Sequence, residues 1–359
     1  MANNARALWV STSMGTRGGI ATFVRTVRDT ELWRQWNVRH VATHRNGSVP
    51  TRIAVFGVAV FRFLFEMVAH RPDVVHIHTS SYGSFYRKCL LTWLTSAFRI
   101  PVVLHVHGSE FQTFFATAPR PVRLLIRATL QRADTVVALG NAWADRLRHI
   151  APRAVVIVVP NAIRPDTPVR QDVTGPVHVV FLGEVGERKG TFTLLDAWAK
   201  MLANGDGLRA RLTIAGDGEV ERAQSHVAAL GIGASVDVRG WIANTAVPDL
   251  LASAHVLVLP SQSEGQPMAI LEAMAKGVCV VASDVGGIPE LLDESCGVLV
   301  HPNDVTELAD AITHVVSDHR ARAQLGANAL DRIRNEFDVE VISRRFDELY
   351  RELVSPRQA

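Results

Sequence analysis

Twelve short runs rich in valine, isoleucine and leucine recur along the chain, with helix-length amphipathic segments between most of them. Most of these runs are continuously apolar rather than alternating, which is typical of parallel strands whose two faces are both buried. Strands that alternate with helices form βαβ units and doubly wound parallel sheets. The runs therefore predict an α/β protein, with strands at 7–11, 38–43, 73–78, 101–107, 135–139 and 155–159 in the first half and at 177–182, 210–215, 236–239, 255–259, 278–282 and 297–300 in the second.

The length of 359 residues suits two domains, each large enough to bury its own core. A proline-rich polar segment from 164 to 176 separates the two sets of runs and has linker character. The sequence thus predicts Rossmann-like domains at 1–163 and 177–336, a linker at 164–176, and a last amphipathic helix within 337–359. Two such domains in tandem place the carboxyl ends of both sheets around a shared central cleft, where α/β folds bind ligands.

The net charge of +3 conceals a split between the two halves. Residues 1–165 contain 21 basic and 7 acidic side chains, whereas the remainder contains 17 basic and 28 acidic ones. Such asymmetry suggests that the first domain meets something anionic, either a membrane surface or a phosphate-bearing acceptor, or that the two domains attract each other. No recognition helix, zinc finger or aromatic RNA motif is present, so nucleic acid is not an expected partner.

The longest stretch without a charged residue, Leu250–Ser263, is too short and too polar to cross a bilayer. Three cysteines without motif spacing are expected to be free thiols, so a cytoplasmic location is predicted. Basic amphipathic stretches at 52–70 and 85–99, in the first of which Arg62 and Glu66 form an i,i+4 pair, could lie on the inner face of the cell membrane. They could equally be the helices that cover a Rossmann sheet. A basic run of four arginines adds to the first interpretation: Arg120, Arg123, Arg127 and Arg132.

The segment from Pro260 to Gly277, PSQSEGQPMAILEAMAKG, directly follows a predicted strand. Pro267 suits a first helical turn, residues 268–276 suit a helix, and Gly277 suits the position after its end. Glu264 then lies in the loop before a helix N-terminus and Glu272 lies inside the helix. Free N–H groups at such a terminus suit phosphate or sugar oxygens, and carboxylates there can bind sugar hydroxyls. Alternatively, Glu264 stabilises the helix dipole and Glu272 is solvated surface.

This segment resembles the hallmark of glycosyltransferase family 4 of the retaining GT-B enzymes, S-x-x-E-G-x-P-x-x-x-L-E-A-M-A-x-G, and residues 278–290 continue as in that family. The resemblance implies that Glu264 contacts the transferred sugar and that Glu272 holds the ribose hydroxyls of the nucleotide. It also implies that the donor is bound by the backbone of Gly265, Gln266, Pro267, Met268 and Ala269.

Two glycine-containing loops fit the same family. In residues 181–190, FLGEVGERKG, the resemblance implies that Lys189 binds the donor diphosphate, where a cation offsets the developing charge of the leaving group. The family commonly has an arginine where this chain has Glu184, so either Arg188 takes over the phosphate role or the diphosphate has one cation fewer. The resemblance extends a phosphate-facing role to Gly18 and Gly19, which join the first strand to the next helix.

Histidines occur in pairs on two adjacent predicted strands. With a period of two, His76 and His78 point the same way, and so do His105 and His107. A metal site is not expected, because no carboxylate or cysteine has suitable spacing. A histidine at the end of a strand is ordinarily a hydrogen-bonded core residue, whereas the resemblance implies that His107 reaches the donor sugar and aligns the reaction.

Three further positions have weaker expectations. Trp241 falls where the family lines the pocket for the nucleotide base, as a contact or as wall. Glu110 and Asn161 are either acceptor-side polar residues or loop and cap residues.

The resemblance implies metal-independent transfer of a sugar from a UDP- or GDP-sugar to a hydroxyl of a glycan or polyprenyl-linked acceptor, with retention of anomeric configuration and no cofactor. Cell-surface polysaccharide or glycolipid synthesis is the expected setting. The rival hypotheses are a UDP-sugar 2-epimerase of similar architecture and a catalytically silent nucleotide-sugar-binding protein. Intact Glu264, Glu272, Lys189 and His107 argue against silence, and Glu184 argues for it.

Overall fold

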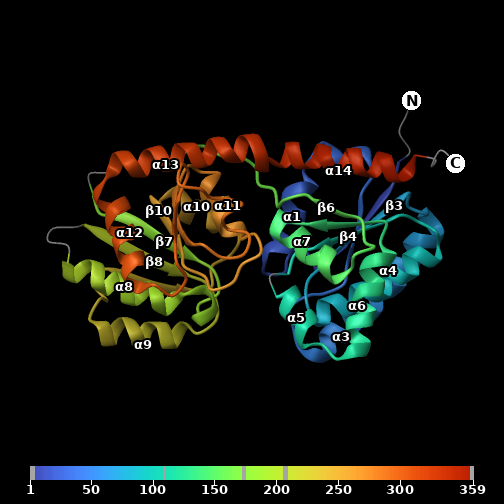
Figure 1. The fold of residues 1–359 in the computed structure, drawn as a ribbon, viewed down its shortest axis with the longest axis horizontal. Helices are drawn as coiled ribbons and strands as arrows, with labels where there is room; N and C mark the ends of the chain where they lie inside the picture. The colour runs from blue at the N-terminus through green and yellow to red at the C-terminus, as the bar shows by residue number, and fades with distance from the viewer. Residues whose placement is uncertain (1–4, 109, 172–174, 205–208, 356–359) are drawn as a thin grey trace. The chain divides into compact units, whose positions relative to one another are not determined.

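A computed structural model describes residues 5–108, 110–171, 175–204 and 209–355. The chain divides into two compact units, unit 1 comprising residues 1–162 and 339–359 and unit 2 comprising residues 163–338. Each unit has a six-stranded sheet covered by helices (Figure 1). Unit 2 includes residues 164–176, which the sequence predicts as a separate linker.

In unit 1 the strands are arranged in the order β2-β1-β3-β4-β5-β6, and every neighbouring pair is parallel. The strands are β1 (Ala7–Ser11), β2 (Arg39–Ala42), β3 (Val74–Thr79), β4 (Val102–Val106), β5 (Thr135–Ala138) and β6 (Val156–Val158). The helices are α1 (Gly19–Arg28), α2 (Glu31–Gln35), α3 (Val49–Phe65) with its continuation η1 (Glu66–His70), α4 (Gly83–Ala97), α5 (Phe111–Thr117), α6 (Arg120–Arg132), α7 (Asn141–Ile150) and α14 (Val339–Val354).

Unit 2 repeats the plan, with parallel strands in the order β12-β11-β10-β7-β8-β9. The strands are β7 (Val177–Leu182), β8 (Ala210–Ala215), β9 (Val236–Gly240), β10 (Val256–Leu259), β11 (Cys279–Ser283) and β12 (Val298–Val300). The helical segments are η2 (Glu187–Lys189), α8 (Thr191–Asn204), α9 (Val220–Leu230), α10 (Val247–Ala252), α11 (Met268–Met274), α12 (Val305–Ser317), α13 (His319–Arg332) and η3 (Ile333–Phe337).

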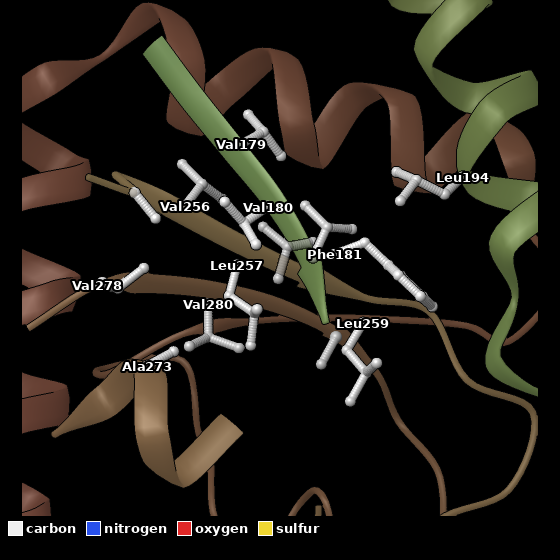
Figure 2. Close-up of a cluster of buried hydrophobic side chains, with 14 of the residues drawn as sticks. Val179, Val180, Phe181, Leu194, Val256, Leu257, Leu259, Ala273, Val278 and Val280 are labelled. Carbon is white, nitrogen blue, oxygen red and sulfur yellow. The ribbon is translucent and has the colours of Figure 1, made fainter. Parts of the chain in front are cut away.

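The runs in the middle of each sheet form buried strands, as the sequence predicts, whereas the edge strands β2 and β9 expose charged residues such as Arg39 and Asp237. In the core of unit 2, Val179 and Val180 from β7 lie beside Val256 and Leu257 from β10, and all four are fully buried (Figure 2). Successive residues on one strand point to opposite faces, so a run without polar residues fills the core on both sides of the sheet. All twelve predicted strands are present, and each end lies within two residues of its predicted place.

The last helix, α14, belongs to unit 1 although the chain enters it from unit 2. Its apolar face buries Ile342, Phe346 and Tyr350, and Trp36 Nε1 donates a hydrogen bond of 2.8 Å to Asp347. Side chains three or four residues apart share one face of a helix, which explains this pattern. The C-terminal helix therefore covers the sheet of the first unit.

The predicted linker, 164–176, belongs to unit 2, and residues 172–174 lie outside the described residues. The backbone N–H of Asp166 donates to Ala275 O at 2.9 Å and that of Val169 to Lys276 O at 2.8 Å. The buried Arg322 donates from Nε to Gln171 Oε1 at 3.0 Å. The prediction that this stretch is a linker was therefore wrong. A proline-rich composition does not show which backbone carbonyl groups elsewhere in the fold can accept hydrogen bonds from the N–H groups of the stretch.

Helix α3 with its continuation η1 differs from the other helices of unit 1. Residues Val49–His70 form one described helix long and apolar enough to cross a membrane by length and composition. The longest uncharged run of the sequence lies elsewhere, because Arg62 and Glu66 interrupt the apolar residues of this helix. The predicted pair between these two residues was wrong, since Glu66 binds Arg39 of β2 at 3.0 Å instead. Ala59, Phe63 and Met67 are buried against unit 1, so this helix lies on the unit with its other face exposed.

Candidate active site

The loops at the carboxyl ends of β7, β8, β10 and β11 meet at one edge of the sheet in unit 2. They approach so closely that side chains are excluded at several points. A Cβ on Gly286 would lie 1.9 Å from Glu264 O, and one on Gly287 would lie 2.1 Å from Gly265 O. A Cβ on Gly190 would lie 1.9 Å from Pro260 O. Backbone packing therefore holds the loop after β10 from both sides. The sequence motif covers residues 260–277, but the part that Gly286 and Gly287 play in fixing it was not predicted.

Glu264 lies at the centre of this loop and is only 6% exposed. Its Oε1 accepts a hydrogen bond from Ser261 Oγ at 2.7 Å and forms an ion pair with Lys189 Nζ. The structure thus brings together two residues for which the sequence predicts separate contacts, one with the sugar and one with the diphosphate. Carboxylate and ammonium hold each other in place, which preorganises both for a ligand.

Arg188 and Glu184 form a second ion pair on the same loop, with 2.7 Å between Nη2 and Oε2. Both side chains are largely exposed, so the pair contributes little to stability. Its effect is electrostatic, because the glutamate offsets the charge that Arg188 could offer to a phosphate. The backbone of Arg188 is also fixed, since its carbonyl oxygen accepts a hydrogen bond of 2.9 Å from the N–H of Gln262.

Helix α11 carries Glu272, which is half-buried. It begins at Met268 and ends at Met274, two residues before the predicted end, and Gly277 follows it with φ 65°. Pro267 is the residue before the helix rather than part of its first turn. Because proline has no N–H, it can only shape the loop and cannot donate to a ligand. Gly265, Gln266 and Met268 are buried and Ala269 is half-buried.

Two other predicted donor contacts are at exposed positions. Trp241 follows β9 in unit 2 and is 47% exposed. Gly18 and Gly19 lie at the start of α1 in unit 1. Gly18 has φ 113°, a conformation that favours glycine, and no atom lies within 4 Å of where its Cβ would be. The loop thus has an open face at which a ligand could approach the backbone.

The four paired histidines form a hydrogen-bonded ladder on one face of the unit 1 sheet. His76 Nε2 and His105 Nδ1 are 3.2 Å apart, and His78 Nδ1 and His107 Nε2 are 3.0 Å apart. His76 Nδ1 also bonds the hydroxyl of Tyr350 from α14. Burial holds the pKa values of His76, His78 and His105 well below the usual range, so the three rings are neutral at physiological pH.

His107 stands at the end of this ladder, half-buried beyond the last residue of β4. Burial lowers its pKa to about 3, and a side-chain hydrogen bond to Asn161 acts in the opposite direction. Its ring therefore has a polar partner on either side, His78 and Asn161. A neutral, oriented imidazole can accept or donate a hydrogen bond but carries no charge of its own.

In the part of the chain that the structure describes, three histidines have ring nitrogens close enough together to hold a metal, all within 4.8 Å of one another: His76, His78 and His105. No carboxylate or cysteine joins them in that group. Two of their ring nitrogens already bond to each other and a third bonds Tyr350, and the site is fully buried. This chemistry fits a hydrogen-bonded core better than a metal centre.

Comparison with known proteins covers both units. A family model described as Glycosyl transferase 4-like domain matches residues 7–162, and one described as Glycosyl transferases group 1 matches residues 176–318. The alpha-D-kanosaminyltransferase of Streptomyces kanamyceticus is 23% identical over 78% of this chain and 77% of its own length. The putative teichuronic acid biosynthesis glycosyltransferase TuaC of Bacillus subtilis is 24% identical over 74% of this chain and 67% of its own.

Solved structures show the same fold. The sucrose-phosphate synthase of Thermosynechococcus elongatus superposes with a TM-score of 0.81 at 20% identity, over 97% of this chain and 99% of that one. The Anabaena protein Alr3699/HepE, solved in complex with UDP and glucose, superposes with a TM-score of 0.74 at 20% identity, over 96% and 99% of the two chains. Two parallel six-stranded sheets, each within a matching glycosyltransferase domain, place the chain among the GT-B glycosyltransferases.

Proposed function

We propose that this enzyme is a retaining glycosyltransferase that moves a sugar from a UDP- or GDP-sugar to a hydroxyl of a glycan or lipid-linked acceptor, in cell-surface polysaccharide or glycolipid synthesis. The observation that carries the proposal is the buried Lys189–Glu264 pair in the glycine-held loops of unit 2. The relative named for teichuronic acid synthesis supports the setting, and the Anabaena structure with UDP and glucose supports a UDP-sugar donor.

In this proposal Glu264 binds hydroxyls of the transferred sugar while Lys189 binds the diphosphate. The bond between the anomeric carbon and the diphosphate oxygen breaks, and the acceptor oxygen forms the new bond on the same face. The acceptor proton goes to the departing diphosphate, whose charge Lys189 stabilises in place of a metal. Glu264 and Glu272 do not flank a scissile bond as the two carboxylates of a glycosidase do. Glu272 and the backbone from Gly265 to Ala269 hold the rest of the donor.

We further infer that the enzyme works in the cytoplasm on the inner face of the cell membrane. The exposed face of α3 and η1 carries large apolar side chains that are between 55% and 72% exposed: Val49, Ile53, Val58, Phe61, Phe65 and Val68. Nearby in sequence, α4 exposes Leu90 and Trp93, and α6 exposes Leu124 among its arginines. Apolar side chains beside cationic ones suit the surface of an anionic bilayer.

The catalytic proposal is tested by incubating the enzyme with UDP- and GDP-sugars, with and without a polyprenyl-linked glycan. Transfer that needs the acceptor, with an anomeric configuration in the product matching that of the donor by NMR, is the expected result. An epimerised donor formed without acceptor would favour the 2-epimerase hypothesis. Donor binding without turnover would favour a silent binding protein.

The membrane proposal is tested by sedimentation with phosphatidylcholine vesicles that contain 30% phosphatidylglycerol, on the order of bacterial anionic lipid content. Binding should weaken steeply between low and physiological salt. A Phe61→Asp/Val68→Asp variant and an Arg120→Glu/Arg123→Glu/Arg127→Glu variant should each bind less while keeping donor affinity. Normal vesicle binding by both variants would assign the charge split to attraction between the two units.

A further inference from the structure

Three cationic side chains and a histidine lie on the segments that follow β2 and β3 in unit 1. His44 follows β2, Arg52 lies in the first turn of α3, and Arg87 and Lys88 lie in the second turn of α4. The pKa of His44 is lowered first by burial and then by Arg87, Lys88 and Arg52, and the pKa of Arg87 is lowered by burial and by Arg52. Burial and neighbouring positive charge therefore both disfavour the charged forms of these groups, and His44 is neutral at physiological pH.

No acidic side chain offsets this group. Among the residues that the structure describes, none of the four forms an ion pair with a carboxylate. Arg52 Nε donates instead to the carbonyl oxygen of Gly47 at 2.8 Å. Some arginines of both units are paired with an acid, as Arg34 with Glu31 and Arg222 with Glu219. The site thus has a positive potential that an anion would lower.

Lys88 is the deepest of the four. Its side chain is fully buried, and its recorded hydrogen bond, from Nζ to Ser84 Oγ, is 3.4 Å long. Burial, followed by Arg87, lowers its pKa to about 7. A buried ammonium without a carboxylate or several carbonyls around it is costly, so its presence calls for a function. It is also the only lysine among residues 1–165, where the other basic side chains are arginines.

The same segments carry buried hydrogen-bonding atoms that have no partner among the described residues. Ser81 is 7% exposed and its hydroxyl has no partner among the described residues, and the same holds for Arg87 Nε and His44 Nδ1. Ser84 Oγ accepts from Ser80 N at 3.2 Å and from Lys88, which leaves its own proton to donate. Buried polar atoms are ordinarily satisfied, so a ligand would complete this set.

The start of α4 lacks a side-chain cap. Tyr82 precedes the helix with φ 52° and supplies no capping hydrogen bond, and the N–H of Ser84 donates to the carbonyl oxygen of Ser81 at 3.2 Å. Such a backbone conformation is costly for a tyrosine and persists where the surroundings impose it. Gly108, which follows β4, packs closely against this segment, since a Cβ on it would lie 2.8 Å from the hydroxyl oxygens of both Ser80 and Ser81.

We propose that Arg52, Arg87, His44 and the first turn of α4 bind a phosphate group of the acceptor, with Lys88 beneath it as a buried charge. The identification of the ligand as the acceptor rests on the proposed glycosyl transfer, whereas the binding of phosphate does not depend on it. Phosphate chemistry follows from the features together: several cations, hydroxyl donors and a helix N-terminus suit a compact anion with three or more oxygens. That phosphate belongs either to a polyprenyl phosphate in the membrane or to a soluble sugar phosphate.

The test measures inorganic phosphate binding by calorimetry in wild type, Lys88→Met, Lys189→Met and the double variant. Lys189→Met leaves unit 1 unchanged, so it isolates the proposed site from the donor site. The expected result is that Lys189→Met binds phosphate and the double variant binds it at least 10-fold more weakly, on the order expected for losing a charge-assisted contact. Arg153→Gln in the Lys189→Met background is the matched control, since it removes an exposed charge between α7 and β6.

Equal phosphate affinity in Lys189→Met and the double variant would overturn the proposal. Arg87→Met in the same background repeats the test without changing a fully buried residue, so a Lys88 variant that fails to fold leaves the inference testable. Glycerol 3-phosphate and phosphatidic acid vesicles then distinguish the source: only the source that Lys88→Met weakens occupies the site. Transfer activity is not read, so a failure here is distinct from a failure of the proposed function.

Discussion

Among the residues that the structure describes, each unit buries one long cationic side chain, and the surroundings of the two differ. In unit 2, Arg322 is 1% exposed and donates hydrogen bonds to four oxygen atoms. These are Oε1 and the carbonyl oxygen of Gln171 and the carbonyl oxygens of Val315 and Val316. In unit 1, Lys88 is fully buried and has a single long hydrogen bond to Ser84. A satisfied buried cation fastens the fold, whereas an unsatisfied one indicates a ligand.

The same contrast extends to the remaining polar groups. Unit 2 holds Lys189 against Glu264 and locks the surrounding loops with glycines. Unit 1 holds neutral histidines against one another and leaves cations without acids. The candidate site of unit 2 is therefore ordered without a ligand, whereas the basic group of unit 1 has no acidic partner among the described residues.

The largest effect is expected from Arg322→Met. It leaves the oxygens of Gln171 and two helix carbonyls buried without donors, so unit 2 should lose about 3 kcal/mol of unfolding free energy. Urea unfolding measures the loss, and hydrogen exchange shows which unit opens. Arg320→Met, an exposed change on the same helix, is the control. A loss below about 1 kcal/mol would place the two buried cations in the same class.

Lys189→Met should lower turnover by about 10²- to 10³-fold and nucleoside affinity much less, because the charge matters most as the diphosphate departs. Steady-state kinetics and calorimetry with the nucleotide separate the two effects. Lys200→Met removes a lysine on α8 that donates to Thr306 at 2.6 Å and should change neither. If only the Michaelis constant rose, Lys189 would bind the ground state and the preformed pair would not be catalytic.

His107→Ala should lower transfer by about 10²-fold with little change in melting temperature, if its role is to align the donor sugar. If His107 instead only completes the hydrogen-bonded ladder with His78, the variant should melt several degrees lower and keep its turnover per folded molecule. Kinetics and thermal melting of the same samples distinguish the two roles. His149→Ala, at an exposed position on α7, controls for the loss of an imidazole.

Acid should open unit 1 before unit 2. The unfolded chain protonates its histidines below about pH 6.5, but burial keeps them neutral in the fold, so stability is lost as pH falls below that value by about 1.4 kcal/mol per pH unit for each such histidine. Besides His44, burial lowers the pKa of five histidines in unit 1: His40, His76, His78, His105 and His107. In unit 2 it lowers the pKa of two, His178 and His255.

Hydrogen exchange at pH 7, 6 and 5, corrected for the intrinsic rate, measures this order. Protection should fall first in β3 and β4, which carry the ladder. Equal loss in both units would mean that other titrating groups dominate acid unfolding.

The smallest effect concerns the pH dependence of Lys88→Met. The pKa of Lys88 is about 7 in the fold, below the ordinary 10.5, so the unfolded chain binds a proton that the fold does not between these values. Wild-type stability should therefore fall as pH decreases from about 10 to about 7 and change no further through this group below that. Lys88→Met should melt higher than wild type at pH 7, by a margin that shrinks toward pH 10. A margin independent of pH would show that Lys88 is not a buried unpaired charge.

The sequence by itself determined the strands and the motif. Continuous apolar runs mark strands buried on both faces because the pattern is local and each residue carries it independently. The loop and helix from Pro260 to Gly277 were predictable to within two residues for the same reason, since proline, glycine and helix-forming residues act on their own backbone.

Tertiary structure alone decided which of these residues meet. Lys189 and Glu264 are 75 positions apart, and the pairing that joins them follows from how β7 and β10 align. The proline-rich segment became part of unit 2 because the distant Arg322 donates to Gln171. Lys88 is one basic residue among many in the sequence, and only burial without an acid distinguishes it. Contacts of this kind depend on the three-dimensional balance of charge and desolvation, which no local pattern contains.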